Sequence, residues 1–234
     1  MRTREILGIP ISITDYDGAM DVMDAMIERR DPGYVCAVAV HAVMVAQDDP
    51  VMKAAVTSST LTVPDGMPLV WAANMLGEHL PNRVYGPELM ERFNHRCVER
   101  GHRVWLYGGR DQGSLVQLAL SMRRRHPGIQ IVGGYSPPFR SLTDEEEDAI
   151  VDQINQARPD VLWVGVCEMR PAWKSNAAPT PHITGTSRRS RMWAIHFSCL
   201  GTPMPTHRMS ACEAWICSTS DSSSSSLSER NGGE

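Results

Sequence analysis

The chain has 234 residues, 42% of them hydrophobic, and a formal net charge of −4 at pH 7. This length is enough for one large α/β domain or two small ones, with ample sequence to bury a core. The small negative charge gives no overall attraction to nucleic acid or to an anionic membrane. The sequence therefore predicts no nucleic-acid partner.

Two further features exclude classes of protein. Residues 1–18 hold no long apolar core of a signal peptide, and no apolar stretch approaches the roughly 20 residues of a membrane-spanning helix. The six cysteines form no CxxC pair, which favours reduced thiols over zinc or disulfide sites. We therefore expect a cytoplasmic protein.

Strand-like and helix-like segments alternate up to about Val166. Residues 13–30 have apolar residues at helical spacing after a predicted cap at Thr14, and residues 34–46 resemble a strand that passes into a helix. Further strands are expected at 103–109, 129–135 and 159–166, and further helices at 87–100, 111–125 and 144–157.

Residues typical of helix ends support these predicted helices. Gly101 stands where a C′ glycine belongs, and Thr143 with Glu146 has the spacing of a capping box. Strands separated by helices of about ten to fifteen residues predict an α/β fold: a Rossmann-like parallel sheet with helices on both faces.

The alternation stops after Cys167. The remaining residues show no sustained period, and they include several prolines and a run of serines at 222–226. A disordered, low-complexity tail is the ordinary interpretation, although Trp173, Trp193 and Trp215 are unusual in such a tail. The predicted organisation is one α/β domain over residues 1–166 and an irregular tail over residues 167–234.

The segment TVPDGMPLVWAANMLG, residues 62–77, places Asp65 and Gly66 between an apolar run and a helix-like segment. In an open parallel sheet, ligands bind outside the carboxyl ends of the strands, where such loops lie. A carboxylate there is either a turn or helix cap, or a catalytic group. The segment itself leaves both interpretations open.

Three other places also allow two interpretations. Gly108-Gly109 before a helix can present backbone N–H groups to a phosphate, but two glycines at a strand end also make an ordinary turn. His41 lies inside an apolar run and is either a packed core histidine or part of a site. Arg83 can pair with a phosphate or can be an ordinary surface arginine.

Together these segments resemble the WecG/TagA/CpsF glycosyltransferases. The resemblance runs from Ile6 to about Gly165, in family order, through ILGIPI, VHAVMVAQDDP, VPDGMPLVWAANMLG, RVYGPELM, VWLYGG, HPGIQIVGGY and DVLWVG. The PDGMPLVW block at 64–71 followed by RVYGPELM at 83–90 is quite specific. These bacterial enzymes add an N-acetylmannosamine-type sugar to a lipid-linked precursor of cell-surface polymers.

The resemblance implies roles for the candidate residues. Asp65 is expected to be the general base that takes a proton from the acceptor hydroxyl as it attacks the anomeric carbon. Arg83 and the Gly108-Gly109 loop are expected to stabilise the charge of the leaving nucleotide diphosphate. The other residues expected at the substrate site are His41, Gly66, Gly86 and Glu88.

The resemblance also implies partners and a place of action. The donor is expected to be a UDP-sugar and the acceptor a polyprenyl-diphosphate-linked sugar, with no metal ion or other cofactor. The chain is then expected at the inner face of the membrane as a peripheral protein, and a homo-oligomer is left open. Two alternatives remain: a catalytically inactive, truncated remnant that still binds nucleotide sugars, and an unrelated Rossmann-like nucleotide-binding module.

The sequence departs from the family pattern in several places. Residues 37–40 are apolar where many relatives have Thr or Asn, and Glu88 stands where Asp is usual. The family continues with a GxPKQExW block and then GVGGAFDFxAG, and neither occurs in this chain.

Translation of the opposite DNA strand supplies sequences close to both absent blocks. With GC-rich codons, PAWKSNAAPTP at residues 171–181 gives GVGAAFDFHAG, and residues 195–207 can give VGIGVPKQEKWI. We infer that antisense sequence has replaced the family's C-terminal part. A segment never selected as protein is expected to be irregular, not to complete the sheet, and to leave the chain inactive or barely active.

Overall fold

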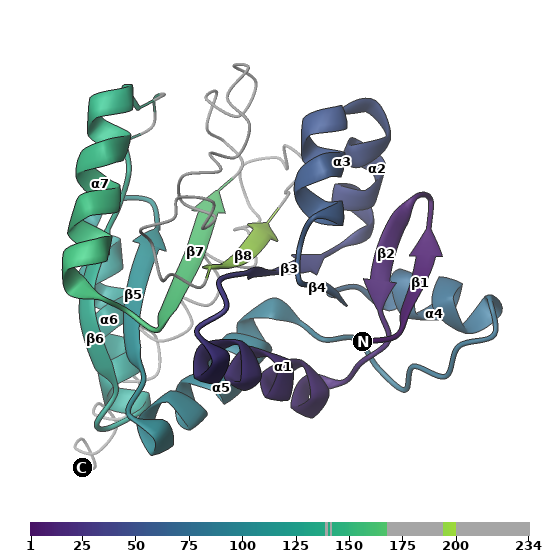
Figure 1. Cartoon of the computed structure of the whole chain (residues 1–234), viewed down its shortest axis with the longest axis horizontal. Coiled ribbons are helices and arrows are strands. Elements are labelled where there is room, and N and C mark those ends of the chain that lie inside the picture. Colours follow the sequence, from purple (N-terminus) through teal and green to yellow (C-terminus); the bar gives the residue numbers. More distant parts are fainter. Residues whose placement is uncertain (139, 141, 168–193, 200–234) are drawn as a thin grey trace, which may run out of the picture.

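We describe a computed structural model of the chain for residues 1–138, 140, 142–167 and 194–199. The elements are, in chain order, β1 (Thr3–Ile6), β2 (Ile9–Ser12), α1 (Tyr16–Arg29), β3 (Tyr34–Val38), α2 (Val40–Asp48), α3 (Pro50–Thr57), β4 (Leu61–Pro64), α4 (Met67–Met75), α5 (Gly86–Arg100), β5 (Arg103–Gly108), α6 (Gln112–Arg125), β6 (Gln130–Tyr135), α7 (Asp144–Ala157), β7 (Val161–Cys167) and β8 (Ala194–Cys199). Figure 1 shows a main sheet of six parallel strands, in the order β4-β3-β8-β7-β5-β6, and a separate antiparallel hairpin of β1 and β2.

Helices cover both faces of the main sheet. Val35 and Ala37 of β3 pack in a cluster with residues of α1, α5 and α6. The alternate residues Cys36 and Val38 pack in a second cluster with α2, α3, α4 and the hairpin. Trp105 of β5 packs on that second side against α7. The predicted α/β fold with a parallel sheet and helices on both faces is confirmed.

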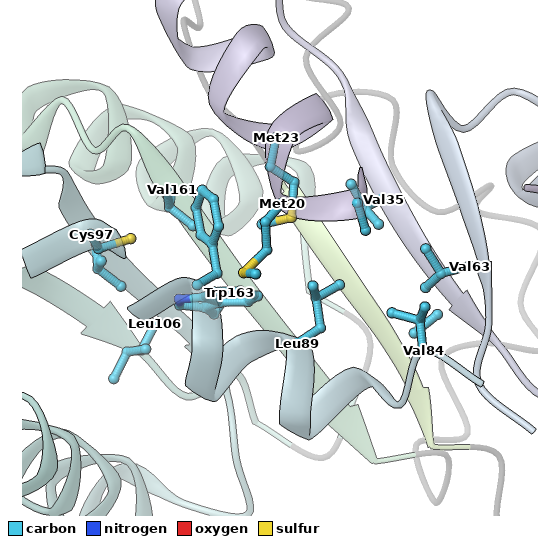
Figure 2. Close-up of a cluster of buried hydrophobic side chains, with 14 of the residues drawn as sticks. Met20, Met23, Val35, Val63, Val84, Leu89, Cys97, Leu106, Val161 and Trp163 are labelled. Atoms are coloured by element: carbon cyan, nitrogen blue, oxygen red, sulfur yellow. The ribbon is translucent and has the colours of Figure 1, made fainter. Parts of the chain in front are cut away.

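The first cluster fixes α5 against the sheet. Figure 2 shows Val84, just before α5, beside Val63 of β4, with Leu89 of α5 and Trp163 of β7 further along the same cluster. The Trp163 indole donates a hydrogen bond to Asn94 Oδ1 at 3.0 Å, so its polar edge is satisfied inside the core. Each buried side chain of this kind contributes roughly 1.5–3 kcal/mol. The packing holds the start of α5 beside the end of β4.

Most of the predicted helix ends are confirmed, and one is wrong. Gly101 follows α5 in the left-handed region with φ 71°, and Thr143 with Glu146 forms the capping box of α7. Thr14 does not cap α1. Asp15 is the N-cap, and its carboxylate accepts the Gly18 N–H at 2.9 Å, because its side chain stands at the right distance from the third N–H of the helix.

The sequence did not predict the β1–β2 hairpin. Its two-residue turn puts Leu7 and Gly8 at φ 50° and 76°, as a type I′ turn requires. Arg2 and Arg4 form ion pairs with the buried carboxylate of Glu78, which follows α4, and the Arg2 pair is 2.8 Å long. The hairpin is thereby attached to the loop after α4. It also lies against the edge strand β4, whose Thr62 N–H donates to the Ser12 hydroxyl of β2 at 3.1 Å.

The tail contributes a strand, which corrects one prediction. Residues 194–199 form β8, which lies between β3 and β7 and pairs in parallel with both. The expectation that nothing after Cys167 would complete the sheet is therefore wrong for these residues. The segment AIHFSC contains the strand-favouring Ile195 and Phe197, and strand pairing uses backbone groups that every sequence has. The rest of the predicted tail, 168–193 and 200–234, lies outside the described residues.

Candidate functional site

Asp65 lies at the carboxyl end of β4 and is not the cap of the helix that follows it. Its backbone N–H donates to Val38 O at 2.9 Å, which ties it to the end of β3. Its side-chain Oδ1 accepts the Gly86 N–H, the first N–H of α5, at 3.1 Å. Gly66 is the N-cap of α4, and no side chain caps that helix. The carboxylate therefore reaches across to a different helix.

The environment of Asp65 favours proton acceptance. Burial raises the pKa of this carboxyl group, while the hydrogen bond from Gly86 and the positive charge of Arg83 lower it. Burial is the largest of these effects, so the pKa lies above the ordinary value of an aspartate. A carboxylate with a raised pKa at a strand end suits general base catalysis.

Three helices begin around this carboxylate, and in none of them does the N-cap residue's own side chain bond the first turn. The N-cap residues without a capping bond are Ala39 of α2, Gly66 of α4 and Tyr85 of α5. The described α1, α3, α6 and α7 are instead capped by the side chains of Asp15, Asp49, Asp111 and Thr143. The first turns of α2 and α4 carry positive potential from N–H groups without helical partners, whereas the Gly86 N–H of α5 is already bonded to Asp65. The starts of α2 and α4 therefore favour an anionic ligand at this end of the sheet.

Three other predicted site residues lie on the loop before α5 or in the first turns of α2 and α5. Arg83 is exposed, and its guanidinium lies over the Tyr85 ring, 4.7 Å from the centroid. His41 is half-buried at the second position of α2, next to the end of β3. Glu88, in the first turn of α5, forms an ion pair with Arg92 at 2.7 Å, so part of its charge is already neutralised.

The Gly108-Gly109 loop at the end of β5 has a structural explanation of its own. Gly108 has φ 126°, and a Cβ there would collide with the carbonyl oxygen of Gly165 on β7. The Gly109 N–H donates to that same oxygen at 3.0 Å. The Asp111 side chain accepts the Ser114 N–H at 2.7 Å and so caps the following helix, α6. The Gly109 N–H expected to bind a phosphate is thus already bonded within the protein.

The sheet order separates the two groups of predicted site residues. Strands β3, β8 and β7 lie between β4 and β5, which makes four strand spacings, or about 19 Å at ~4.8 Å each. Asp65, Gly66, Arg83, Gly86, Glu88 and His41 belong to the β3–β4 end, and Gly108-Gly109 belongs to the β5 end. That both ends contact one donor stays a prediction.

Two tyrosines that were not predicted as site residues lie at the starts of α5 and α1, beside the Asp65–Gly86 bond. Tyr16, the first residue of α1, accepts a hydrogen bond from the Tyr85 N–H at its phenol oxygen, at 3.0 Å. Tyr85 lies within the RVYGPELM block, so the block itself pointed to it. Tyr16 is 69 positions away and had no such signal.

Two further properties of the described residues concern membranes and metals. No helix in this part of the chain has both the length and the apolar character to span a bilayer. No three histidine, cysteine, aspartate or glutamate side chains among the same residues gather as metal ligands.

Comparison with known proteins identifies a matching family. The model of the glycosyl transferase WecG/TagA/CpsF family matches residues 4–170. A curated relative from Bacillus spizizenii, N-acetylglucosaminyldiphosphoundecaprenol N-acetyl-beta-D-mannosaminyltransferase, is 26% identical over 121 residues, which cover 52% of this chain and 45% of the relative. The matched region thus spans about half the length of that relative. The family match includes every residue of the Asp65 site, and the chain belongs to the WecG/TagA/CpsF family of glycosyltransferases.

Proposed function

We propose that the chain transfers an N-acetylmannosamine-type sugar from a UDP-sugar to a polyprenyl-diphosphate-linked acceptor in the synthesis of a cell-surface polymer. The family membership supports the reaction class, and the name of the Bacillus spizizenii relative supports the sugar and the lipid diphosphate. One observation carries the proposal to this site: Asp65 is a half-buried carboxylate at a strand end, with a raised pKa and a bond to another helix.

In the proposed reaction, Asp65 accepts the proton of the acceptor hydroxyl. The hydroxyl oxygen attacks the anomeric carbon of the donor, and the bond from that carbon to the diphosphate oxygen breaks. The electron pair of the broken bond leaves with UDP, and the family resemblance implies inversion at the anomeric carbon. A positioned base contributes typically about 10²–10⁴-fold to such a step.

The leaving diphosphate gains negative charge as the bond breaks. Arg83 stands on the loop before α5 and can pair with phosphate oxygens through its planar guanidinium. The uncapped starts of α2 and α4 add positive potential at the same place. Protein groups therefore supply the positive partners in this proposal, and no metal ion or other cofactor takes part.

The acceptor determines where the chain works. A polyprenyl chain stays in the bilayer, so the diphosphate and its sugar lie at the membrane surface. We expect the chain to act there as a peripheral protein on the inner face.

A second candidate is a chain that binds the donor but transfers no sugar. The GxPKQExW and GVGGAFDFxAG blocks are absent from the sequence, and the family match ends at residue 170. A segment read from the opposite DNA strand accounts for both facts. The third alternative, an unrelated Rossmann-like module, is excluded by the family membership.

Sugar transfer tests the proposal directly. The purified full chain is mixed with UDP-N-acetylmannosamine and a short polyprenyl-diphosphate-linked N-acetylglucosamine, and the product is measured by mass spectrometry. Donor binding is measured separately by calorimetry. Transfer that disappears in Asp65→Asn supports the proposal, and binding without transfer supports the second candidate.

A matched chain separates the two candidates further. In this variant, residues 167–234 are replaced by the opposite-strand translation, and resequencing of the locus shows which version the organism carries. A large gain in transfer would support the antisense origin of the tail. Equal activity in both chains would reject it.

A further inference from the structure

A phenol from α1 holds the backbone next to the candidate base. The oxygen of the half-buried Tyr16 accepts the N–H of Tyr85, the N-cap of α5, at 3.0 Å. The following N–H, of Gly86, donates to Asp65 Oδ1 at 3.1 Å. Pro87, the next residue, has no N–H to donate. Two consecutive N–H groups at the start of α5 are therefore held by oxygens from two distant segments.

The phenol itself is held in place from the other side. The Arg92 guanidinium lies over the Tyr16 ring, 4.3 Å from the centroid, and forms an ion pair with Glu88 one turn earlier on α5. Helices α1 and α5 lie side by side (Figure 1), and Arg96 bridges them through Asp24 at 2.8 Å. These contacts fix the position of the phenol oxygen relative to the first turn of α5.

We propose that Tyr16 is a positioning residue for sugar transfer: its oxygen fixes the start of α5, so that Gly86 holds one oxygen of Asp65 and the other oxygen faces the acceptor. The inference rests on the proposed role of Asp65 as the base. A general base must point within hydrogen-bond reach of the proton it takes, and small errors in position lower the rate strongly. Tyr16 touches the backbone beside Asp65 and needs no contact with substrate.

The titratable side chains near Tyr16 and Asp65 come from several elements. Arg83 lies on the loop before α5, Glu88 and Arg92 lie on α5, and His41 lies at the start of α2. Burial raises the pKa of Asp65, and the Gly86 hydrogen bond and the Arg83 charge lower it. Loss of the Tyr16 oxygen loosens the start of α5 and weakens the Gly86 bond. The pKa of Asp65 should then rise further.

The variant Tyr16→Phe tests this inference because it keeps the ring under Arg92 and removes only the oxygen. We expect kcat of the full chain to fall roughly three- to tenfold, the range of one lost hydrogen bond, with the donor KM nearly unchanged. The acid limb of the kcat profile should move to higher pH. The pKa of the Asp65 carboxyl group, followed by ¹³C NMR, should rise with it.

Tyr34→Phe is the matched control. The Tyr34 phenol donates to the Ala55 carbonyl at 2.6 Å, so this variant also loses one phenol-to-backbone bond, at α3. It should lower Tm without moving the acid limb or the Asp65 pKa. If Tyr16→Phe behaves like this control, Tyr16 is only structural and the inference is overturned.

The NMR titration separates this inference from the proposed function, because it requires no sugar transfer. A raised Asp65 pKa in Tyr16→Phe supports the positioning role even if the wild-type chain transfers no sugar, a result that counts against the proposed function. An unchanged pKa and an unchanged acid limb in an active chain reject the positioning role and leave the proposed function standing.

Discussion

The loops after β4 and β5 differ in how their backbone is bonded. After β5, the Gly109 N–H is bonded to Gly165, and the Asp111 side chain caps the following helix. After β4, the helix starts at Gly66 without a side-chain cap, and the Asp65 carboxylate bonds the start of another helix. Glycines after a strand therefore do not by themselves indicate a phosphate loop. What matters is whether the local N–H groups already have partners.

The largest expected difference between the two loops is in sugar transfer, after replacement of the carboxylate in each loop. Asp65→Asn keeps the shape of the side chain but cannot accept a proton, so sugar transfer should fall by about 10²–10⁴-fold. Binding of the UDP-sugar, measured by calorimetry, should remain nearly unchanged. Asp111→Asn serves as the control, and we expect it to transfer sugar at the wild-type rate.

A second pair of variants compares the glycines. Gly108→Ala places a side chain at φ 126° against the Gly165 carbonyl, and we expect it to lower the free energy of unfolding by about 2–4 kcal/mol. Gly66→Ala has φ −120°, and its Cβ would meet only Pro68 Cδ at 3.6 Å. Chemical denaturation should therefore find the Gly66 variant close to wild type. Equal loss in both variants would contradict the close approach of β5 and β7.

A third pair of variants tests which loop binds the diphosphate of the donor. Arg83→Gln removes the guanidinium beside Asp65 and should weaken donor binding about tenfold, the size expected for one charge-assisted contact. Arg110→Gln removes the exposed arginine that pairs with Asp111 at 3.1 Å in the β5 loop. Calorimetry should find donor binding unchanged in this second variant. Weaker binding in Arg110→Gln would instead place the diphosphate at the β5 loop.

Local signals explain how much of the fold could be predicted from the sequence. The C′ position of Gly101 and the capping box of Thr143 depend on neighbouring residues only, and both predictions are confirmed. The sequence predicted Thr14 as the cap of α1, one residue before the observed cap, Asp15, because both side chains can cap a helix. The short hairpin β1–β2 has four-residue strands, too few for a clear alternation.

The site was less predictable because its contacts join distant residues. Asp65 was found through its block, but its partner Gly86 is 21 positions away and Tyr16 is 69 positions from Tyr85. No local pattern specifies such pairs. The separation of the Asp65 end from the Gly108 end depends on strand order, and in particular on β8, which no periodicity indicated.

The last prediction concerns the pH dependence of stability. Replacing Asp65 and replacing Asp111 should change Tm in opposite directions. Burial raises the pKa of Asp65, whereas the hydrogen bond from the Ser114 N–H lowers the pKa of Asp111. At neutral pH we expect Asp65→Asn to have a higher Tm than wild type, and Asp111→Asn a lower one. The measurement is Tm of both variants and wild type between pH 3 and 7, a range of roughly four units around the ordinary aspartate value.

The signs follow from proton binding in the two states. A folded-state pKa above the unfolded one means that Asp65 stabilises the fold while protonated, and this contribution is lost as pH rises through the raised pKa. The amide in Asp65→Asn stays neutral at every pH, so the variant should lose its advantage over wild type in acid.

Asp111, with its lowered pKa, stabilises the fold above the unfolded-state pKa, and that contribution is lost as pH falls through the folded-state value. A half-buried charge that weakens the fold at working pH is expected at a catalytic position, where proton transfer takes precedence over stability. If Asp65→Asn lowers Tm at neutral pH as Asp111→Asn does, the carboxylate is a structural cap, and the contrast between the two loops fails.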